Sequence, residues 1–253
     1  MRFNMNTVKD MLKAGKTAIG TTANLSSPAE FLADSGFDFI LFDTQHEAVD
    51  IKQLKDQLQT MKGKKAIPII RVGENDQALV CYALDIGAKG IVVPMVNTKQ
   101  EAINMVQWCK YPPEGQRSSA GMRGEWGKFE SYRDYMDTFN REVLVIPMIE
   151  TVESMNNIDE ILSVPGIDVL LVGPSDLSIN LGMPLDYQNP KYAEALDKIA
   201  AACKKAGVIP AMYFIPGGHD PNNYVERGFK LFTLPWNKWA ANGIQSGLAT
   251  MKR

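Results

Sequence analysis

Apolar residues in this chain gather in short runs that recur at regular intervals. Most of these runs are continuous rather than alternating, which is typical of parallel strands covered by helices on both faces. The pattern therefore predicts eight strands, at residues 17–23, 37–43, 66–72, 90–96, 143–150, 167–173, 208–214 and 229–235.

The segments between these runs carry apolar residues at helical spacing and often end in glycine, as at 51–63, 98–110 and 191–207. A glycine after the last periodic residue is a common helix stop. Eight strand–helix units in 253 residues predict a single α/β domain over residues 1–253, a (β/α)8 TIM barrel. An open doubly wound sheet is the rival fold, but it would carry a glycine-rich phosphate loop after its first strand, and this sequence has none there.

Two segments depart from the strand–helix repeat. Residues 111–142 are rich in glycine, arginine and aromatic residues, and they interrupt the path from the fourth helix to the fifth strand. A long irregular insertion in a compact domain is usually functional or part of an interface, and a tolerated surface loop is the alternative. Residues from about 237 to 253 are predicted to form a C-terminal helix, and Trp236 and Trp239 suit either an interface or packing on the core.

Composition narrows the class of protein. The net charge of −2 gives no electrostatic reason to expect binding to nucleic acid or to an anionic membrane. The three cysteines are widely spaced and form no disulfide framework, which favours a reducing compartment. No apolar run approaches the ~20 residues of a membrane helix, and the N-terminus lacks an apolar secretion core. We therefore expect a cytoplasmic enzyme or binding protein that acts on small molecules.

Acidic residues follow two neighbouring strands of the predicted barrel, at the end where TIM-barrel chemistry takes place. Glu150 ends the fifth strand, and Asp176 follows the sixth. Desolvating a carboxylate at such a place costs several kcal/mol unless it is paired or bound to a cation. The two acids could bind one hard divalent cation through oxygen. Alternatively, each acid only caps the helix that follows it.

A basic residue and a histidine stand at the same end of the predicted barrel. Arg71 lies near the end of the third strand, and His46 follows the second. A histidine titrates near neutral pH, so His46 is the acid–base candidate, with Asp85 as a carboxylate that could orient it. The spacing in sequence does not place Asp85 beside His46. Lys89 and Lys230 precede their strands, which argues against Schiff-base catalysis.

The stretch GPSDLS at 173–178 predicts an anion site. Gly173 permits a tight turn, Pro174 has no N–H to donate, and the N–H groups of Ser175 and Asp176 open a helix. A helix N-terminus can hold a carboxylate or a phosphate. An ordinary strand-to-helix turn is the alternative.

Several motifs in order along the chain resemble the HpcH/HpaI aldolase family. They cover about residues 17–235 and are FDTQH (42–46), IRV (70–72), LDIGAKGIVVPMV (84–96), YPPEGQRS (111–118), PMIET (147–151) and VGPSDLS (172–178). The resemblance implies a class II pyruvate aldolase, similar to 4-hydroxy-2-oxo-heptanedioate aldolase. Such an enzyme is a metal-dependent aldehyde-lyase that cleaves or forms 4-hydroxy-2-oxo acids through a pyruvate enolate.

The resemblance also implies roles for individual residues. Arg71 would bind the keto oxygen and the developing enolate, and His46 with Asp85 would form an acid–base dyad. Glu150 and Asp176 would bind Mg²⁺ or Mn²⁺, with Co²⁺ as a further candidate. The turn at 173–176 would hold the pyruvate carboxylate on the amides of Ser175 and Asp176. The family also implies a homohexamer in which the C-terminal helix is exchanged between subunits.

Three positions depart from the family pattern. Gln45 stands where many members have Glu, Met148 stands where some have Gln, and Glu47 is unusual beside a substrate with carboxylates. These departures leave intact the residues expected to bind the pyruvate half of the substrate. They bear on which aldehyde the enzyme accepts as the other half.

Two other functions stay open. One is a CoA-ester lyase of the citrate-lyase type, which would need a site for the long CoA arm. The other is a barrel that has lost catalysis and serves as a binding or scaffold subunit.

Overall fold

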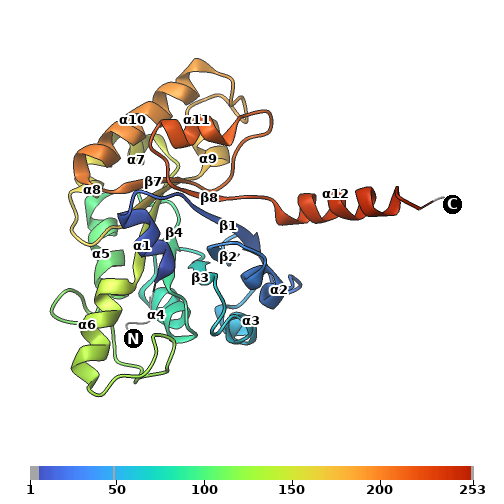
Figure 1. Cartoon of the computed structure of the whole chain (residues 1–253). Coiled ribbons are helices and arrows are strands. Elements are labelled where there is room, and N and C mark those ends of the chain that lie inside the picture. Colours follow the sequence, from blue (N-terminus) through green and yellow to red (C-terminus); the bar gives the residue numbers. More distant parts are fainter. Residues whose placement is uncertain (1–5, 48, 252–253) are drawn as a thin grey trace.

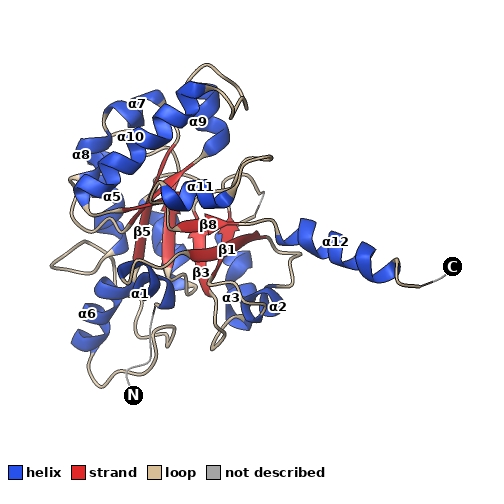
Figure 2. Cartoon of the chain, turned by 45° about the horizontal axis from the view of Figure 1, so that its top comes forward, coloured by secondary structure: helices blue, strands red, loops and turns tan. Residues whose placement is uncertain are grey.

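The computed structural model describes residues 6–47 and 49–251. In this part of the chain, eight parallel strands close into a barrel in sequence order, and β8 pairs with β1 (Figures 1 and 2). The strands are β1 Ala18–Ala23, β2 Phe39–Asp43, β3 Ile67–Arg71, β4 Gly90–Val93, β5 Leu144–Ile149, β6 Val169–Val172, β7 Ile209–Met212 and β8 Leu231–Thr233. Each predicted apolar run contains one of these strands, so the predicted (β/α)8 TIM barrel is confirmed.

Helices surround the barrel, and most begin at a side chain that accepts a hydrogen bond from a backbone N–H in the first turn. Thr98 and Thr151 do so in capping boxes, and Gly207 ends the longest helix in the left-handed conformation. The helices are α1 Thr7–Lys13, α2 Ala29–Asp34, η1 Ile51–Leu54, α3 Lys55–Thr60, α4 Gln77–Asp85, α5 Lys99–Cys109, α6 Tyr132–Glu142, α7 Val152–Asn156, α8 Ile158–Leu162, α9 Pro174–Asn180, α10 Pro190–Ala206, α11 Pro221–Glu226 and α12 Trp236–Leu248.

One set of apolar side chains fills the interior of the barrel. Successive side chains of a strand point to opposite faces, so every second residue points inward. Val8 and Leu12 of α1 join this cluster, so α1 covers the end of the barrel where the strands begin. The strand residues in the cluster include Phe39, Leu41, Ile67, Ile69, Leu144, Ile146, Met148, Val169, Leu171, Ala211 and Leu231.

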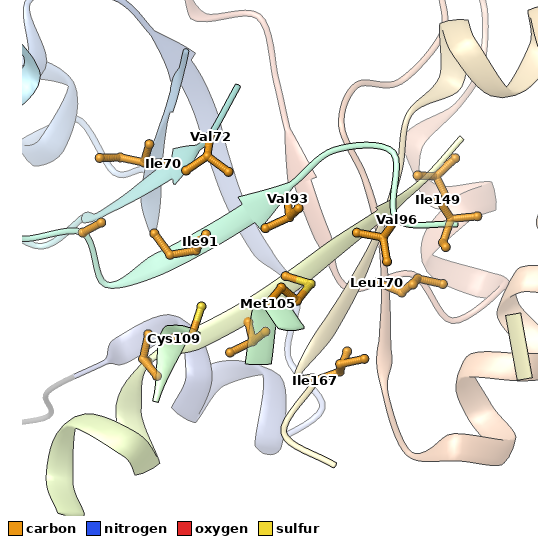
Figure 3. Packing of buried hydrophobic residues seen from close by; sticks show 14 of the residues in the cluster. Ile70, Val72, Ile91, Val93, Val96, Met105, Cys109, Ile149, Ile167 and Leu170 are labelled. Carbon is orange, nitrogen blue, oxygen red and sulfur yellow. The ribbon is translucent and has the colours of Figure 1, made fainter. Parts of the chain in front are cut away.

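A second set of apolar side chains packs between the strands and the surrounding helices. Figure 3 shows part of this layer, where Ile91 and Val93 of β4 lie near Met105 and Cys109 of α5. Burying a side chain of this size stabilises the fold by about 1.5–3 kcal/mol. Because both faces of each strand are covered, the strands appear in the sequence as continuous apolar runs.

The segment 111–142 differs from the expected irregular insertion in its second half. Irregular chain extends to Ser131, whose side chain accepts a hydrogen bond from the Asp134 N–H and begins α6. Tyr135 and Phe139 lie on one face of this helix, and both are buried against Tyr111. Aromatic residues at helical spacing therefore form a helix here, because their common face has an aromatic surface to pack on.

The C-terminal helix α12 projects away from the barrel (Figures 1 and 2). None of its described residues is buried, and the side chains of Trp239 and Ile244 are 49% and 63% exposed. Trp239 touches the barrel body through a stacked contact with Phe37, at 6.2 Å between ring centroids. A helix packed in the core, one of the two alternatives left open by the sequence, is therefore wrong.

The structure also bears on compartment and membrane. The cysteines Cys81, Cys109 and Cys203 are all free thiols. Among the helices that the structure describes, none combines the length and apolar character needed to cross a bilayer. The cytoplasmic location stays a prediction.

Candidate active site

Four polar residues form the top layer of the barrel interior, at the end where the strands finish. Each stands two positions after an inward-facing apolar residue of its strand. Because side-chain direction alternates along a strand, the four side chains converge on the barrel axis. They are Asp43 on β2, Arg71 on β3, Glu150 after β5 and Tyr213 after β7.

Asp43 holds the Arg71 side chain in a two-point ion pair. The two residues are partners in the β2–β3 register, so their side chains start side by side. Arg71 Nε donates to Asp43 Oδ1 at 2.8 Å, and Nη2 donates to Oδ2 at 2.5 Å. Burial acts to raise the pKa of Asp43, but the hydrogen bonds and charge of Arg71 outweigh it, and the pKa is lowered. The carboxylate is therefore ionised and fixes the guanidinium in place.

Tyr213 fixes the same guanidinium from β7. Arg71 Nη2 also donates to the Tyr213 hydroxyl oxygen at 3.0 Å, and the guanidinium carbon lies 4.3 Å from the centroid of the tyrosine ring. Burial raises the pKa of Tyr213 to about 12, so its hydroxyl keeps its proton at neutral pH. The sequence motifs predicted no role for Asp43 or Tyr213, although both residues continue inward-facing rows of their strands that the strand pattern could have revealed.

Glu150 is buried, with 1% of its surface exposed. Its Oε1 accepts a hydrogen bond from the Met95 N–H at 2.9 Å. Met95 has a φ of +53°, a left-handed conformation that non-glycine residues rarely adopt. Burial is the main cause that raises the pKa of Glu150, and the charge of Asp176 adds to it; the Met95 N–H and Arg71 oppose the shift. The protein around Glu150 therefore stabilises the ionised carboxylate less well than water does.

Gly173 makes room for the Glu150 carboxylate. A Cβ at position 173 would lie 2.2 Å from Glu150 Oε2, far inside contact distance. Gly173 is also the N-cap of α9, with Pro174 at the first helical position and Asp176 in the first turn. The N–H groups of Ser175 and Asp176 thus stand at a helix start next to Glu150, as the sequence predicts.

The donor set at this end fits a hard divalent cation. After burial, the negative charge of Asp176 also contributes to raising the pKa of Glu150. A cation between the two acids would favour the charged form of both. Among the described residues, no group of three or more histidine, cysteine, aspartate or glutamate residues is arranged to hold a metal. Water and substrate oxygens would therefore complete the coordination, as is common for Mg²⁺.

The structure does not bring His46 and Asp85 together within one chain. His46 is exposed in the turn after β2, and its charge contributes to lowering the pKa of Asp43. Asp85 ends α4, which carries the chain back to the opposite end of the barrel. There Asp85 Oδ1 accepts a hydrogen bond from Arg117 Nη2 at 2.8 Å, and Oδ2 lies 3.9 Å from Arg123 Nη2.

The family model for HpcH/HpaI aldolase/citrate lyase matches residues 22–237, a range that includes all the strands except the start of β1. The chain belongs to this family. The match spans every residue of the candidate site, from Asp43 to Tyr213. It confirms the family that the sequence motifs indicated.

Relatives of known sequence and structure agree with the family match. The chain is 34% identical to a 4-hydroxy-2-oxo-heptane-1,7-dioate aldolase of Salmonella dublin over 82% of this chain and 80% of that protein. A crystal structure of an HpcH/HpaI aldolase/citrate lyase family protein from Burkholderia cenocepacia J2315 is similar at TM-score 0.85 and 30% identity, covering 97% of this chain and 98% of that one. The citrate synthase SbnG is similar at TM-score 0.81 and 28% identity, covering 96% of both chains.

These similarities confirm the predicted enzyme class. The HpcH/HpaI family consists of aldolases and citrate lyases, enzymes that make or break carbon–carbon bonds. The chain is therefore a carbon–carbon lyase that acts on small molecules. The substrates named for the relatives belong to those proteins.

Proposed function

We propose that this HpcH/HpaI family member is a metal-dependent class II aldolase that cleaves or forms 4-hydroxy-2-oxo acids through a pyruvate enolate. One observation carries the proposal: the buried Glu150 carboxylate stands beside Asp176 and Arg71 at the catalytic end of the barrel. Relatives named 4-hydroxy-2-oxo-heptane-1,7-dioate aldolase support it.

Glu150 and Asp176 would hold the cation. Both offer carboxylate oxygens, which suit Mg²⁺ and Mn²⁺ and also accept Co²⁺. When bound, the cation acts as a Lewis acid that polarises the ketone of the 2-oxo acid.

Arg71 would stabilise the oxygen on which negative charge develops. Its Nε and Nη2 are held by Asp43 and Tyr213, while Nη1 donates to a weak acceptor, Sδ of Met148, at 3.7 Å. Nη1 can therefore leave the Met148 sulfur and donate to an enolate oxygen, while Nε and Nη2 keep the ion pair with Asp43. A donor fixed before the reaction costs no reorganisation during it.

The start of α9 would bind the pyruvate carboxylate. The N–H groups of Ser175 and Asp176 stand at the helix N-terminus, and Pro174 leaves them as the first available donors. Helix N-termini favour anions. Gly173 lets this helix start approach Glu150, so carboxylate and ketone of one 2-oxo acid can be held side by side.

His46 would move the proton. In cleavage it removes the proton from the C4 hydroxyl, the C3–C4 bond breaks, and the electron pair of that bond forms the enolate. Protonation of the enolate at C3 gives pyruvate, and the other product is the aldehyde. His46 lies at the catalytic end of the barrel, exposed near Asp43, where a substrate hydroxyl can reach it.

We further propose that Asp85 orients His46 of a second copy of the chain. Within one chain the two residues lie at opposite ends of the barrel, so their dyad can form only between copies. The exposed apolar side chains of α12, Trp239, Ile244 and Leu248, suit burial against a partner, as in the predicted homohexamer. Light scattering of the full chain tests this assembly, and a monomeric mass would reject it.

The citrate-lyase type of reaction is the second candidate, because the citrate synthase SbnG shares the fold and 28% of the sequence. A CoA-ester substrate would need cations for its phosphates. The described residues that line the cavity beside Asp43 include no lysine or arginine. The aldolase reaction therefore fits this site better, and a comparison of acyl-CoA substrates with free 2-oxo acids separates the two. A non-catalytic barrel would bind metal and pyruvate without turnover on any aldehyde.

The test of the proposed function is exchange of the pyruvate methyl protons in deuterated water, followed by NMR. Exchange should stop with EDTA and return with Mg²⁺ or Mn²⁺, because the enolate forms only in the complete site. This half-reaction needs no knowledge of the aldehyde. No exchange with any of these metals would reject the pyruvate-enolate mechanism.

A further inference from the structure

A cavity of about 400 Å³ opens beside the Asp43–Arg71 pair, at the catalytic end of the barrel. It lies between the ends of β1, β2 and β7 and the start of α12. The cavity is polar, and its lining includes Thr22, Asn24, Asp43, Glu47, Tyr213 and Asn237.

The cavity and the proposed enolate site share a wall. Asp43 and Tyr213 line the cavity, and both contact the Arg71 guanidinium. Glu150 and Asp176 lie across the barrel axis, after β5 and β6. An aldehyde that reacts with an enolate bound on Arg71 therefore has the cavity as the adjoining space for the rest of its chain.

The charge of the lining is acidic. Asp43 and Glu47 contribute carboxylates, and the described lining residues include no lysine, arginine or histidine. Arg71, which contacts the lining residues Asp43 and Tyr213, already pairs with both oxygens of Asp43. Glu47 would therefore repel a second carboxylate on the substrate, and the described lining residues offer no cation to pair with that carboxylate.

The remaining lining groups suit hydroxyl groups. Amide side chains at Asn24 and Asn237 and the hydroxyls of Thr22 and Tyr213 can each donate or accept a hydrogen bond. The Glu47 carboxylate accepts hydrogen bonds from hydroxyl groups but repels anions. Trp236, half-buried, adds an apolar wall against which a short carbon chain can pack.

We propose that this cavity binds the aldehyde half of the substrate and selects an uncharged, hydroxylated aldehyde over one that carries a carboxylate. The inference rests on the proposed aldolase function and names the substrate class of that same site. It separates this chain from the relatives whose name specifies a heptane-1,7-dioate, because Glu47 would repel the distal carboxylate of such a compound.

The first experiment measures the aldol addition of saturating pyruvate to three aldehydes with Mg²⁺. The aldehydes are glyceraldehyde, succinic semialdehyde and propanal. We expect kcat/KM for glyceraldehyde to exceed that for succinic semialdehyde by about tenfold or more, and to exceed that for propanal by a smaller factor. An equal or higher value for succinic semialdehyde would overturn the proposal.

Variants of Glu47 assign the preference to the cavity. The kcat/KM ratio of glyceraldehyde to succinic semialdehyde should fall about tenfold in Glu47→Lys and about threefold in Glu47→Gln, which removes the charge with little change in shape. The ratio is taken within each variant, so a common loss of enolate formation cancels. Glu194→Lys, the same charge change on an exposed residue of α10, should leave the ratio unchanged. An unchanged ratio in both Glu47 variants would contradict the proposal.

Pyruvate proton exchange separates this inference from the proposed function. Metal-dependent exchange together with a preference for succinic semialdehyde would reject the hydroxylated-aldehyde site and leave the aldolase intact. Absence of exchange in the wild-type protein would reject the aldolase and this inference with it.

Discussion

The two ends of the barrel carry similar ion pairs with different surroundings. At each end a nearly buried arginine pairs with an aspartate and lies over a tyrosine ring. The pair at the catalytic end consists of Asp43 and Arg71 with Tyr213, and the pair at the opposite end consists of Asp85 and Arg117 with Tyr111.

The difference between the two pairs lies in what surrounds them. Arg71 pairs with Asp43, which lines the polar cavity, and the charge of the buried Glu150 acts on the guanidinium. Arg117 instead ties the irregular segment after α5 to the end of α4, and its Nε and Nη1 have no hydrogen-bond partner among the described residues. A buried ion pair alone therefore does not mark the place where the metal and the enolate would bind. Asp85 also lines a cavity, of about 550 Å³, so an adjoining cavity does not separate the two pairs either. The buried Glu150 carboxylate, with its raised pKa, distinguishes the catalytic end.

Replacing the acid beside the catalytic pair should have the largest effect. We expect Glu150→Gln to lower metal-dependent turnover by at least about 10³-fold, because the amide loses the charge that would bind the cation. Steady-state assays with added Mg²⁺ measure the loss. Glu153→Gln, on an exposed residue of α7, is the control and should keep activity. Full activity in Glu150→Gln that persists after chelation would rule out the assignment.

Arg71→Lys should lower kcat by about 10²–10³-fold, because lysine keeps the charge but cannot make the two-point pair with Asp43. A greater loss in kcat than in substrate affinity would show that the guanidinium acts on the transition state. An effect on KM alone would mean that Arg71 only binds substrate.

At the opposite end, the change Arg117→Met removes the cation of the second pair, and it should act on stability. We expect the free energy of unfolding to fall by about 2–3 kcal/mol, because Asp85 loses its main partner in a largely buried site. Denaturant titration measures the fall, and turnover per folded molecule should drop far less than in Arg71→Lys. A loss of turnover as large as that of Arg71→Lys, without a loss of stability, would break the comparison.

His46→Ala and Asp85→Asn test the proposed dyad between copies. We expect each to lower kcat by about 10–10²-fold and to leave metal affinity nearly unchanged, since neither residue is a proposed ligand of the cation. The double variant should lose no more than the larger single effect, because the two residues act as one unit. Unchanged kcat in Asp85→Asn would leave Asp85 as a purely structural residue.

The smallest expected effect is on the pH dependence of stability. The pKa of Glu150 is raised by burial first and by Asp176 second, so the folded state keeps this proton where the unfolded chain has lost it. The protonated Glu150 therefore contributes its full stabilisation at pH values below the pKa that Glu150 has in the unfolded chain. This stabilisation is lost as the pH rises through the pKa that Glu150 has in the folded protein.

Metal-free wild-type protein should consequently lose thermal stability relative to Glu150→Gln as pH rises from the ordinary glutamate range towards neutrality. Scanning fluorimetry of both proteins across pH measures this difference. Mg²⁺ should stabilise the wild type more at the higher pH, because it would bind the deprotonated carboxylate. Parallel stability curves for the two proteins would contradict the raised pKa.

The sequence by itself determined the barrel and which end of it carries Arg71, Glu150 and Asp176. Continuous apolar runs fixed the eight strands, since each strand is buried on both faces. Glu150, Asp176 and Arg71 follow or end those runs, so the direction of the chain placed them at the catalytic end. The helix start at Gly173 and Pro174 was likewise local, because it depends on residues next to one another.

Tertiary structure decided the contacts that join distant strands. Arg71 meets Tyr213 across 142 positions of sequence, a neighbour that only closure of the barrel provides. The β2–β3 register placed Asp43 opposite Arg71, and it is a property of the pairing rather than of either strand. Asp85 lies away from His46 because α4 returns the chain to the other end. Local periodicity gives the direction of a side chain, whereas its partners depend on which strands the closed barrel makes neighbours.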